Sequence, residues 1–423
     1  MGRRHLRQLL QLTDRPSENR TGVRRIQQIF LKQKHRLINI IAFYPSSYLT
    51  DFPPPHAFRR PLPACKNPNS DWKNCLKIVQ FNSFLSDPDT MHIGSHLIST
   101  PIALAPMAGI TDKPFRNLAR RYGAGYVVGE MLSSDPSLRH TRKTLRRSDH
   151  SGENGPVAVQ IAGSNPAELA DAARYNVDAG AQIIDINMGC PAKKVCNVLA
   201  GSALLQNEAL VERILQAVVQ AVSVPVTLKT RLGWSDEARN LPTIAKMAEQ
   251  AGIAALAVHG RTRSQMYRGE ASYDLIAEVK QQLSIPLWVN GDLTSPQKAA
   301  AVLAHTGADG IMIGRAAQGQ PWLFADMQHY LAHGKLPEAP AFADCAATLL
   351  AHLQAMHEFY GELAGVRIAR KHMAWYLVRL PDSDAVRHSI NRSDSAAEQY
   401  DILARYLDSQ TLAVWPTDYR TPS

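Results

Sequence analysis

The sequence predicts a (β/α)₈ TIM barrel followed by a small all-helical domain. Three observations support this fold class: eight short apolar runs, helical patterns between them, and a change after about residue 340 to helical patterns alone. Strand-like runs that alternate with helices are typical of a parallel sheet. Eight such units within about 220 residues fit a closed barrel better than an open, doubly wound sheet.

The first 90 residues differ in composition from the rest. They hold 15 Lys and Arg against 6 Asp and Glu, a net charge of +9, and therefore carry most of the chain's formal charge of +10. They are rich in Arg and then in Pro, without a sustained helical or strand period, so we expect 1–90 to be a disordered or non-native extension. A transit peptide is the alternative. We favour Met91 as the true start of the protein.

The remaining residues have a composition typical of a folded protein in a reducing compartment. Five widely spaced cysteines, with no secretory segment ahead of them, favour a cytoplasmic location. No apolar run reaches the roughly 18 residues that a membrane helix needs, so we expect no membrane association. Because this part of the chain has a net charge of only +1, it must bind any polyanion through local basic patches.

The eight apolar runs follow one another between residues 101 and 316. Each is short, β-branched or rich in Ala and Leu, and bounded by Gly or Pro, as strands are. In order they are 101–109, 123–131, 156–163, 181–189, 225–233, 254–262, 285–292 and 309–316. Between them lie amphipathic helical patterns, for example at 165–180 and 209–222. We assign 91–340 to the barrel.

Beyond residue 340 the strand-like runs stop. Residues 349, 353, 356 and 360 form an apolar helical stripe, and 395–409 repeat the pattern, so we expect a helical domain over 341–410 and a tail over 411–423. Arg367, Arg370 and Lys371 fall within one turn on one helical face. They form either a solvated basic face or a nucleic-acid contact.

Polar or charged residues end nearly every predicted strand. Because the carboxyl ends of barrel strands face the active site, these residues are candidates for the site. The last two runs end in "NGD" and "GRA". There Gly lets a ligand approach the backbone closely and Arg315 adds a positively charged guanidinium, so the two motifs predict a phosphate site. Two ordinary tight turns are the alternative.

Three side chains stand out by chemistry. Lys229 lies among apolar neighbours and should meet an anionic or carbonyl-rich ligand, because an unpaired buried ammonium is costly. His259 is either part of the site or a satisfied core histidine. Cys190 occupies a Gly-Cys-Pro turn, where a core cysteine is unusual, and we expect it to be reactive. The Cys and His spacings do not match a zinc site, so we expect no metal.

Eight motifs, in this order along the chain, resemble the tRNA-dihydrouridine synthases, most closely their bacterial B-type. They are "APMAGITDKPFR", "QIAGSNP", "DINMGCPAKKV", "AGSALL", "VTLKTRLGW", "HGRTR", "NGDL" and "MIGRAAQGQPW". The resemblance covers about residues 97–410. One departure is the stretch Cys196-Asn197-Val198, where the B-type enzymes commonly carry further basic residues.

The resemblance implies an FMN-bound barrel that reduces the 5,6 double bond of a uridine in the tRNA D-loop, at the seventeenth nucleotide, with NADPH as reductant and no protein partner. Cys190 would be the general acid. Pro106, Met107 and Ala108 would line the flavin ring, Gln160 and Lys229 its polar edge, and His259, Asn290, Gly291, Asp292, Gly314 and Arg315 the ribityl phosphate. Contacts to the base or the tRNA would come from Asn187, Lys193, Lys194, Arg231, Arg367, Arg370 and Lys371.

Two other functions remain open from the sequence. A small-molecule flavin barrel of the dihydroorotate dehydrogenase type also performs redox chemistry on a pyrimidine. Such an enzyme would have no use for the basic helical domain. A tRNA-binding chaperone with a vestigial barrel is the second alternative. The intact "NGD" and "GRA" motifs argue against it, because they predict retained FMN.

Overall fold

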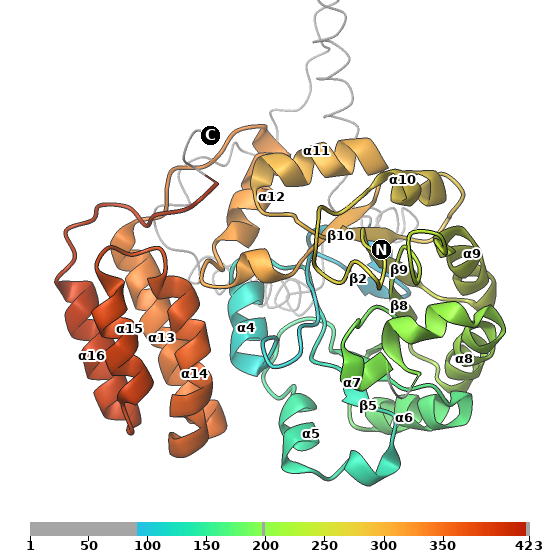
Figure 1. Cartoon of the computed structure of the whole chain (residues 1–423), viewed down its shortest axis with the longest axis horizontal. Helices are drawn as coiled ribbons and strands as arrows, with labels where there is room; N and C mark the ends of the chain where they lie inside the picture. Colours follow the sequence, from blue (N-terminus) through green and yellow to red (C-terminus); the bar gives the residue numbers. More distant parts are fainter. Residues whose placement is uncertain (1–90, 197–198, 420–423) are drawn as a thin grey trace, which may run out of the picture. The chain divides into compact units, whose positions relative to one another are not determined.

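The computed structural model describes residues 91–196 and 199–419. The predicted extension 1–90 and the departure at Asn197 and Val198 lie outside the described residues. Figure 1 shows the strands surrounded by helices, and a separate group of helices late in the chain. None of the helices in these described ranges is both long and apolar enough to span a bilayer.

All eight predicted runs form strands of one parallel sheet. The strands are β3 (Ile102–Leu104), β4 (Tyr126–Val127), β6 (Ala158–Ala162), β7 (Ile183–Asn187), β8 (Val226–Arg231), β9 (Ala255–His259), β10 (Leu287–Asn290) and β11 (Gly310–Ile313). A ninth strand, β5 (Leu132–Ser133), begins directly after the second predicted run, which ends at Met131.

The sheet closes on itself. Its strand order is β4-β3-β11-β10-β9-β8-β7-β6-β5. Val128, directly after β4, forms a parallel bridge with Ala158 of β6, so β4 and β5 occupy a single position in the ring. The described strands therefore form the predicted (β/α)₈ TIM barrel.

Helices follow the strands and cover the outside of the barrel (Figure 1). They are α4 (Lys113–Arg121), α6 (Pro166–Asp178), α8 (Glu208–Ala221), α9 (Leu241–Ala251), α10 (Asp274–Lys280), α11 (Pro296–Thr306) and α12 (Leu323–His333). Local chemistry fixes several of their ends. Asn165 accepts hydrogen bonds from the amides of Ala167 and Glu168 before α6, and Gly307 ends α11 in the left-handed conformation.

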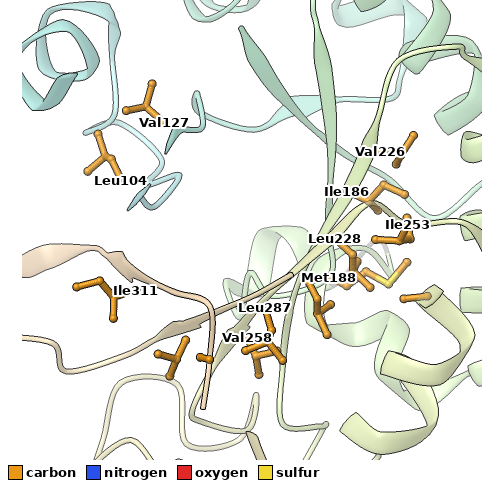
Figure 2. Packing of buried hydrophobic residues seen from close by; sticks show 14 of the residues in the cluster. Leu104, Val127, Ile186, Met188, Val226, Leu228, Ile253, Val258, Leu287 and Ile311 are labelled. Carbon is orange, nitrogen blue, oxygen red and sulfur yellow. The ribbon is translucent and has the colours of Figure 1, made fainter. Parts of the chain in front are cut away.

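Strand residues alternate between two cores. In β7, Ile184 and Ile186 point outward into the large cluster between sheet and helices, which Figure 2 shows in part. Ile183 points instead into the barrel, as Ala257 and Trp288 do from other strands. This period of two means that Asp185 and Asn187, which share the parity of Ile183, also face the interior.

A short hairpin closes the amino end of the barrel. Strands β1 (His92–Ile93) and β2 (His96–Leu97) pair in antiparallel fashion. Ile93 and Ile98 are fully buried in the interior cluster, together with Tyr126 and Trp288. Apolar side chains therefore fill the barrel near this hairpin, and the polar residues lie toward the opposite end.

The last helices form a bundle with its own core. They are α13 (Phe342–Tyr360), α14 (Glu362–Leu377), α15 (Ser383–Arg392) and α16 (Ala396–Asp408). Leu349, Leu353 and Met356 of the predicted stripe are fully buried in this core, and Tyr360 packs against it. Trp415, beyond α16, packs into the same core.

The bundle contacts the barrel closely at Gly319. A Cβ atom at this position would lie 2.2 Å from the Trp375 carbonyl oxygen and 2.7 Å from the Tyr376 nitrogen, both in α14. Elsewhere, the Tyr360 hydroxyl donates to Asp112 Oδ2 at 2.8 Å and Tyr122 Oη lies 2.8 Å from Thr348 Oγ1. The bundle is thus held against the barrel by the close approach of Gly319 to α14 and by polar side-chain contacts.

Gly319→Ala should destabilise the protein more than Gly334→Ala. Both glycines have φ near +70°, so each substitution costs about 1–2 kcal/mol of backbone strain. Only Gly319 adds a clash with α14, which we expect to cost a further ~1–3 kcal/mol, because nothing lies within 4 Å of a Cβ at Gly334. Urea unfolding of the two variants measures the difference, and equal losses would contradict the close approach.

Candidate functional site

A cavity of about 550 Å³ opens at the carboxyl ends of the strands. Every residue predicted to bind flavin lines it, and so do Asn187, Cys190 and Arg231. The predicted flavin residues along its wall are Pro106, Met107, Ala108, Gln160, Lys229, His259, Asn290, Gly291, Asp292, Gly314 and Arg315. Residues from most strands of the barrel therefore converge on one volume.

A chain of hydrogen bonds starts at Asp185, deep in the barrel. Its carboxylate accepts from Thr227 Oγ1 at 2.6 Å and from Gln160 Nε2 at 2.7 Å. The Gln160 oxygen accepts in turn from Asn187 Nδ2 at 2.7 Å. Burial raises the pKa of Asp185 to about 6, against the opposing effects of these hydrogen bonds and of Lys229, so the carboxylate is mostly ionised at pH 7.

This series of hydrogen bonds ends at the turn that carries Cys190. Asn187 Oδ1 accepts from the amides of Gly189 at 3.1 Å and Cys190 at 3.0 Å. On the other side, Ser202 Oγ donates to the Cys190 carbonyl at 2.9 Å. A Cβ atom on Gly201 would lie 2.8 Å from the same carbonyl oxygen, so the "AGSA" segment needs glycine there. The backbone of Cys190 is thus held from both sides.

The Cys190 thiol is partly buried and lines the cavity. Burial raises its pKa above the ordinary thiol value, an effect that outweighs the hydrogen bond from the Ala192 amide and the nearby cations Arg231 and Lys229. The thiol is therefore protonated at neutral pH. In this state it can donate a proton to a molecule in the cavity, whereas a nucleophilic role would require the thiolate.

Lys229 projects into the cavity from β8. Its Nζ donates to Asn290 Oδ1 at 3.0 Å, and the Asn290 amide donates to the Met312 carbonyl at 2.7 Å. Burial, followed by the charge of Arg231, lowers the pKa of Lys229 to about 8, while Asp185 opposes the shift. The ammonium is still mainly charged at pH 7.

His259 is buried and neutral among cations. Burial and the charges of Arg231, Lys229, Arg261 and Arg315 hold its pKa well below the ordinary imidazole value. Arg261 NH1 lies 3.3 Å from His259 Nε2. Since a guanidinium only donates, this contact places the imidazole proton on Nδ1.

The two predicted phosphate motifs lie side by side across β10 and β11. Gly291 has φ +118°, and a Cβ there would lie 2.9 Å from His259 Cδ2. The Arg315 guanidinium stacks over Tyr267 at 4.6 Å and keeps 57% of its side chain exposed. Asp292 pairs with Arg261 at 2.6 Å, so its carboxylate shapes the loop and only its backbone can approach an anion.

Arg231 is more deeply buried than a substrate contact needs to be. Its side chain is 2% exposed and donates to the carbonyls of Gly189 at 2.7 Å, Thr262 at 3.0 Å and Met266 at 2.9 Å. It joins the loops after β7 and β9 at the wall of the cavity. A direct role in substrate binding remains a prediction.

The predicted basic residues of α14 lie outside the cavity wall. Arg367 is exposed, Arg370 donates to the Ser393 carbonyl at 3.0 Å, and Lys371 donates to the Gly109 carbonyl in the loop after β3. Lys193 and Lys194 begin a short helix, α7 (Lys193–Cys196), directly after the Cys190 turn. Their contact with RNA remains a prediction.

Sequence reasoning missed several residues of the site. Asp185 could have been recognised from the sequence, because a carboxylate inside an apolar strand needs hydrogen-bond partners. Tyr267, Met131 and Gln318 line the cavity. Met131 ends the second predicted run and Gln318 lies in the last of the eight motifs, so both could also have been recognised, whereas Tyr267 comes from a loop without a pattern. Within residues 91–196 and 199–419, no group of three or more His, Cys, Asp or Glu could hold a metal ion.

Comparison with known proteins gives consistent matches. The family model described as Dihydrouridine synthase (Dus) matches residues 103–411. The tRNA-dihydrouridine synthase B of Xanthomonas axonopodis pv. citri is 57% identical over 326 residues, which cover 77% of this chain and 98% of that protein. The protein of the same name from Pseudomonas aeruginosa is 58% identical over 303 residues, covering 71% and 91%. That of Vibrio cholerae is 53% identical over 320 residues, covering 75% and 99%.

Cys190 should react slowly with iodoacetamide at pH 7. Because burial raises its pKa, the alkylation rate should rise with pH and reach its midpoint above the ordinary thiol value of ~8.5. Mass spectrometry of the peptide that contains Cys190 measures the rate, with the buried Cys345 as an internal reference. A midpoint below the ordinary value would indicate an activated thiolate and contradict a protonated thiol.

Proposed function

Because the chain belongs to the dihydrouridine synthase family, we propose that it reduces the 5,6 double bond of a uridine in the D-loop of tRNA. FMN is the bound cofactor and NADPH the reductant, and the reaction takes place in the cytoplasm. The observation that carries the proposal is the position of Cys190 on the wall of the cavity that every predicted flavin residue also lines.

The residues of the cavity suit FMN. Its volume lies within the range of about 300–1,000 Å³ usual for cofactor sites. Lys229 brings a charged donor to the position predicted for the polar edge of the flavin ring. Gly291 and Gly314 line the cavity together with the exposed guanidinium of Arg315, and a Cβ atom at Gly314 would meet nothing closer than 3.7 Å, which suits the phosphate. The neutral His259 adds an Nδ1 donor without further charge.

When bound, reduced FMN supplies the hydride that adds to C6 of the uracil. The product also needs a proton at C5, on the face of the ring opposite the hydride. Cys190 holds that proton on its sulfur at neutral pH and donates it as general acid. Asn187 and Ser202 hold the backbone of Cys190, so the thiol stays in place while the base enters.

The uridine must leave its stack to enter the barrel, so the tRNA has to be held by surfaces outside the cavity. Exposed cations provide candidate contacts: Arg367 on α14, and Arg142 and Lys143 on α5 (Arg142–Arg147). Lys193 and Lys194 follow the catalytic turn, and we assign them to backbone phosphates. The resemblance to the B-type enzymes favours the seventeenth nucleotide as the target.

The two alternative functions receive less support. The relatives named above are tRNA-dihydrouridine synthases, and none of those three is a dihydroorotate dehydrogenase. A vestigial barrel would not need a cysteine at the cavity whose backbone is held from both sides. Mass spectrometric mapping of dihydrouridine in tRNA from a strain that lacks this gene tests the proposal. An unchanged D-loop would overturn it.

Cys190→Ala should abolish uridine reduction and leave cofactor chemistry intact. We expect the rate of dihydrouridine formation to fall by about 10²–10⁴-fold, because the proton donor is lost. Bound FMN and tRNA-independent NADPH oxidation should stay near wild type. Cys345→Ala, which removes a buried thiol of α13 far along the chain, is the control. Full dihydrouridine formation by Cys190→Ala would exclude Cys190 as the acid.

Lys229→Met should weaken flavin retention. Methionine keeps the length of the stem but removes the charged donor, and a charged hydrogen bond contributes about 1.5–3 kcal/mol, so we expect FMN to bind roughly tenfold or more weakly. Flavin absorbance after gel filtration measures this. Lys246→Met, at an exposed lysine of α9, is the matched control. Equal flavin content in both variants would remove Lys229 from the flavin site.

A further inference from the structure

The loop after β3 presents Pro106, Met107 and Ala108 to the cavity. The loop is tightly folded, because the Thr111 hydroxyl donates to the Ala105 carbonyl at 3.0 Å and accepts from the Met107 amide at 2.9 Å. Gly109 lies at its tip with φ +73°. The position of this one glycine therefore sets how the loop faces the cavity.

Both polar groups of Gly109 are held by side chains from other elements. Its N–H donates to Glu130, between β4 and β5, and its carbonyl accepts from Lys371 of α14. Glu130 is 5% exposed and is itself fixed by Arg147 at 2.7 Å. Arg147 also donates to the carbonyl of Met131, another cavity residue, at 3.1 Å.

Lys371 is therefore turned toward the barrel, unlike Arg367 one turn earlier. It is partly buried, and burial lowers its pKa while the carboxylates of Asp112 and Glu130 oppose that shift. Arg367 is exposed. The two residues belong to one basic face in the sequence, yet only one of them reaches the loop that lines the cavity.

We propose that Lys371 is a positioning residue that couples the helical bundle to the active site. It holds the Gly109 carbonyl from the bundle while Glu130 holds the Gly109 amide from the barrel, so the loop with Met107 and Ala108 is set correctly only when α14 is docked. The link to catalysis rests on the proposed function, because it assumes that these loop residues contact the flavin and that the bundle contacts tRNA.

The test compares three variants of the full chain. Lys371→Met removes the donor but keeps the stem, Lys371→Arg keeps a charged donor, and Arg367→Met removes an exposed charge from the same helix. Amide hydrogen exchange of the peptide spanning 106–111 is measured on flavin-free, tRNA-free protein. Flavin absorbance and dissociation constant, and kcat and KM for tRNA, are measured on the loaded enzyme.

In Lys371→Met, loop exchange should become about tenfold faster, as expected for the loss of a charged hydrogen bond. The flavin spectrum should shift, and kcat should fall more than KM for tRNA rises. Lys371→Arg should recover most of the protection. Arg367→Met should raise KM for tRNA and leave loop exchange and the flavin spectrum unchanged.

The inference is overturned if Lys371→Met changes only KM for tRNA, since Lys371 would then be an RNA contact like Arg367. It is also overturned if Lys371→Met and Lys371→Arg lose loop protection equally. Failure of the proposed function looks different: no variant, nor the wild type, would bind FMN or form dihydrouridine. In that case the hydrogen-exchange experiment would still test whether Lys371 holds the Gly109 carbonyl.

Discussion

The direction of the hydrogen bonds around the cavity depends on one buried carboxylate, Asp185. An ionised carboxylate only accepts, so Thr227 and Gln160 must both donate to it. This fixes the Gln160 oxygen toward Asn187, and the Asn187 oxygen toward the amide of Cys190. The position of the Cys190 backbone at the rim therefore depends on the buried charge of Asp185, two residues before the end of β7.

Burial and the charge around the cavity together keep one histidine neutral. Burial is the largest cause of the lowered pKa of His259, and the charges of Arg231, Lys229, Arg261 and Arg315 add to it. Two of these cations have tasks of their own: Arg261 pairs with Asp292, and Arg231 binds backbone carbonyls. Lys229 and Arg315 line the cavity, where Lys229 also donates to Asn290 and Arg315 stacks over Tyr267. Under the proposed function, Arg315 would meet the phosphate of FMN and Lys229 the polar edge of its ring.

The sequence could predict the residues of the cavity because the fold gives strand ends a common location. Once a closed parallel barrel is accepted, Gln160, Lys229 and Asn290 must share one rim, and the family resemblance is confirmed by the comparisons. Charge alone could not show which cations are buried. Arg231 and Lys371 remain predicted RNA contacts. The structure adds that both bind backbone carbonyls, which depends on packing between segments distant in the chain.

The hairpin at the amino end of the barrel limits how the two substrates can reach the cavity. Ile93 and Ile98 fill the interior near Trp288, so the apolar end offers no polar path to the cavity through the described residues. Under the proposed function, the nicotinamide and the flipped base must both arrive through the carboxyl-end mouth. They would then occupy it in alternation, with the oxidised nucleotide leaving before the nucleic acid enters, and each would act as a competitive inhibitor of the other.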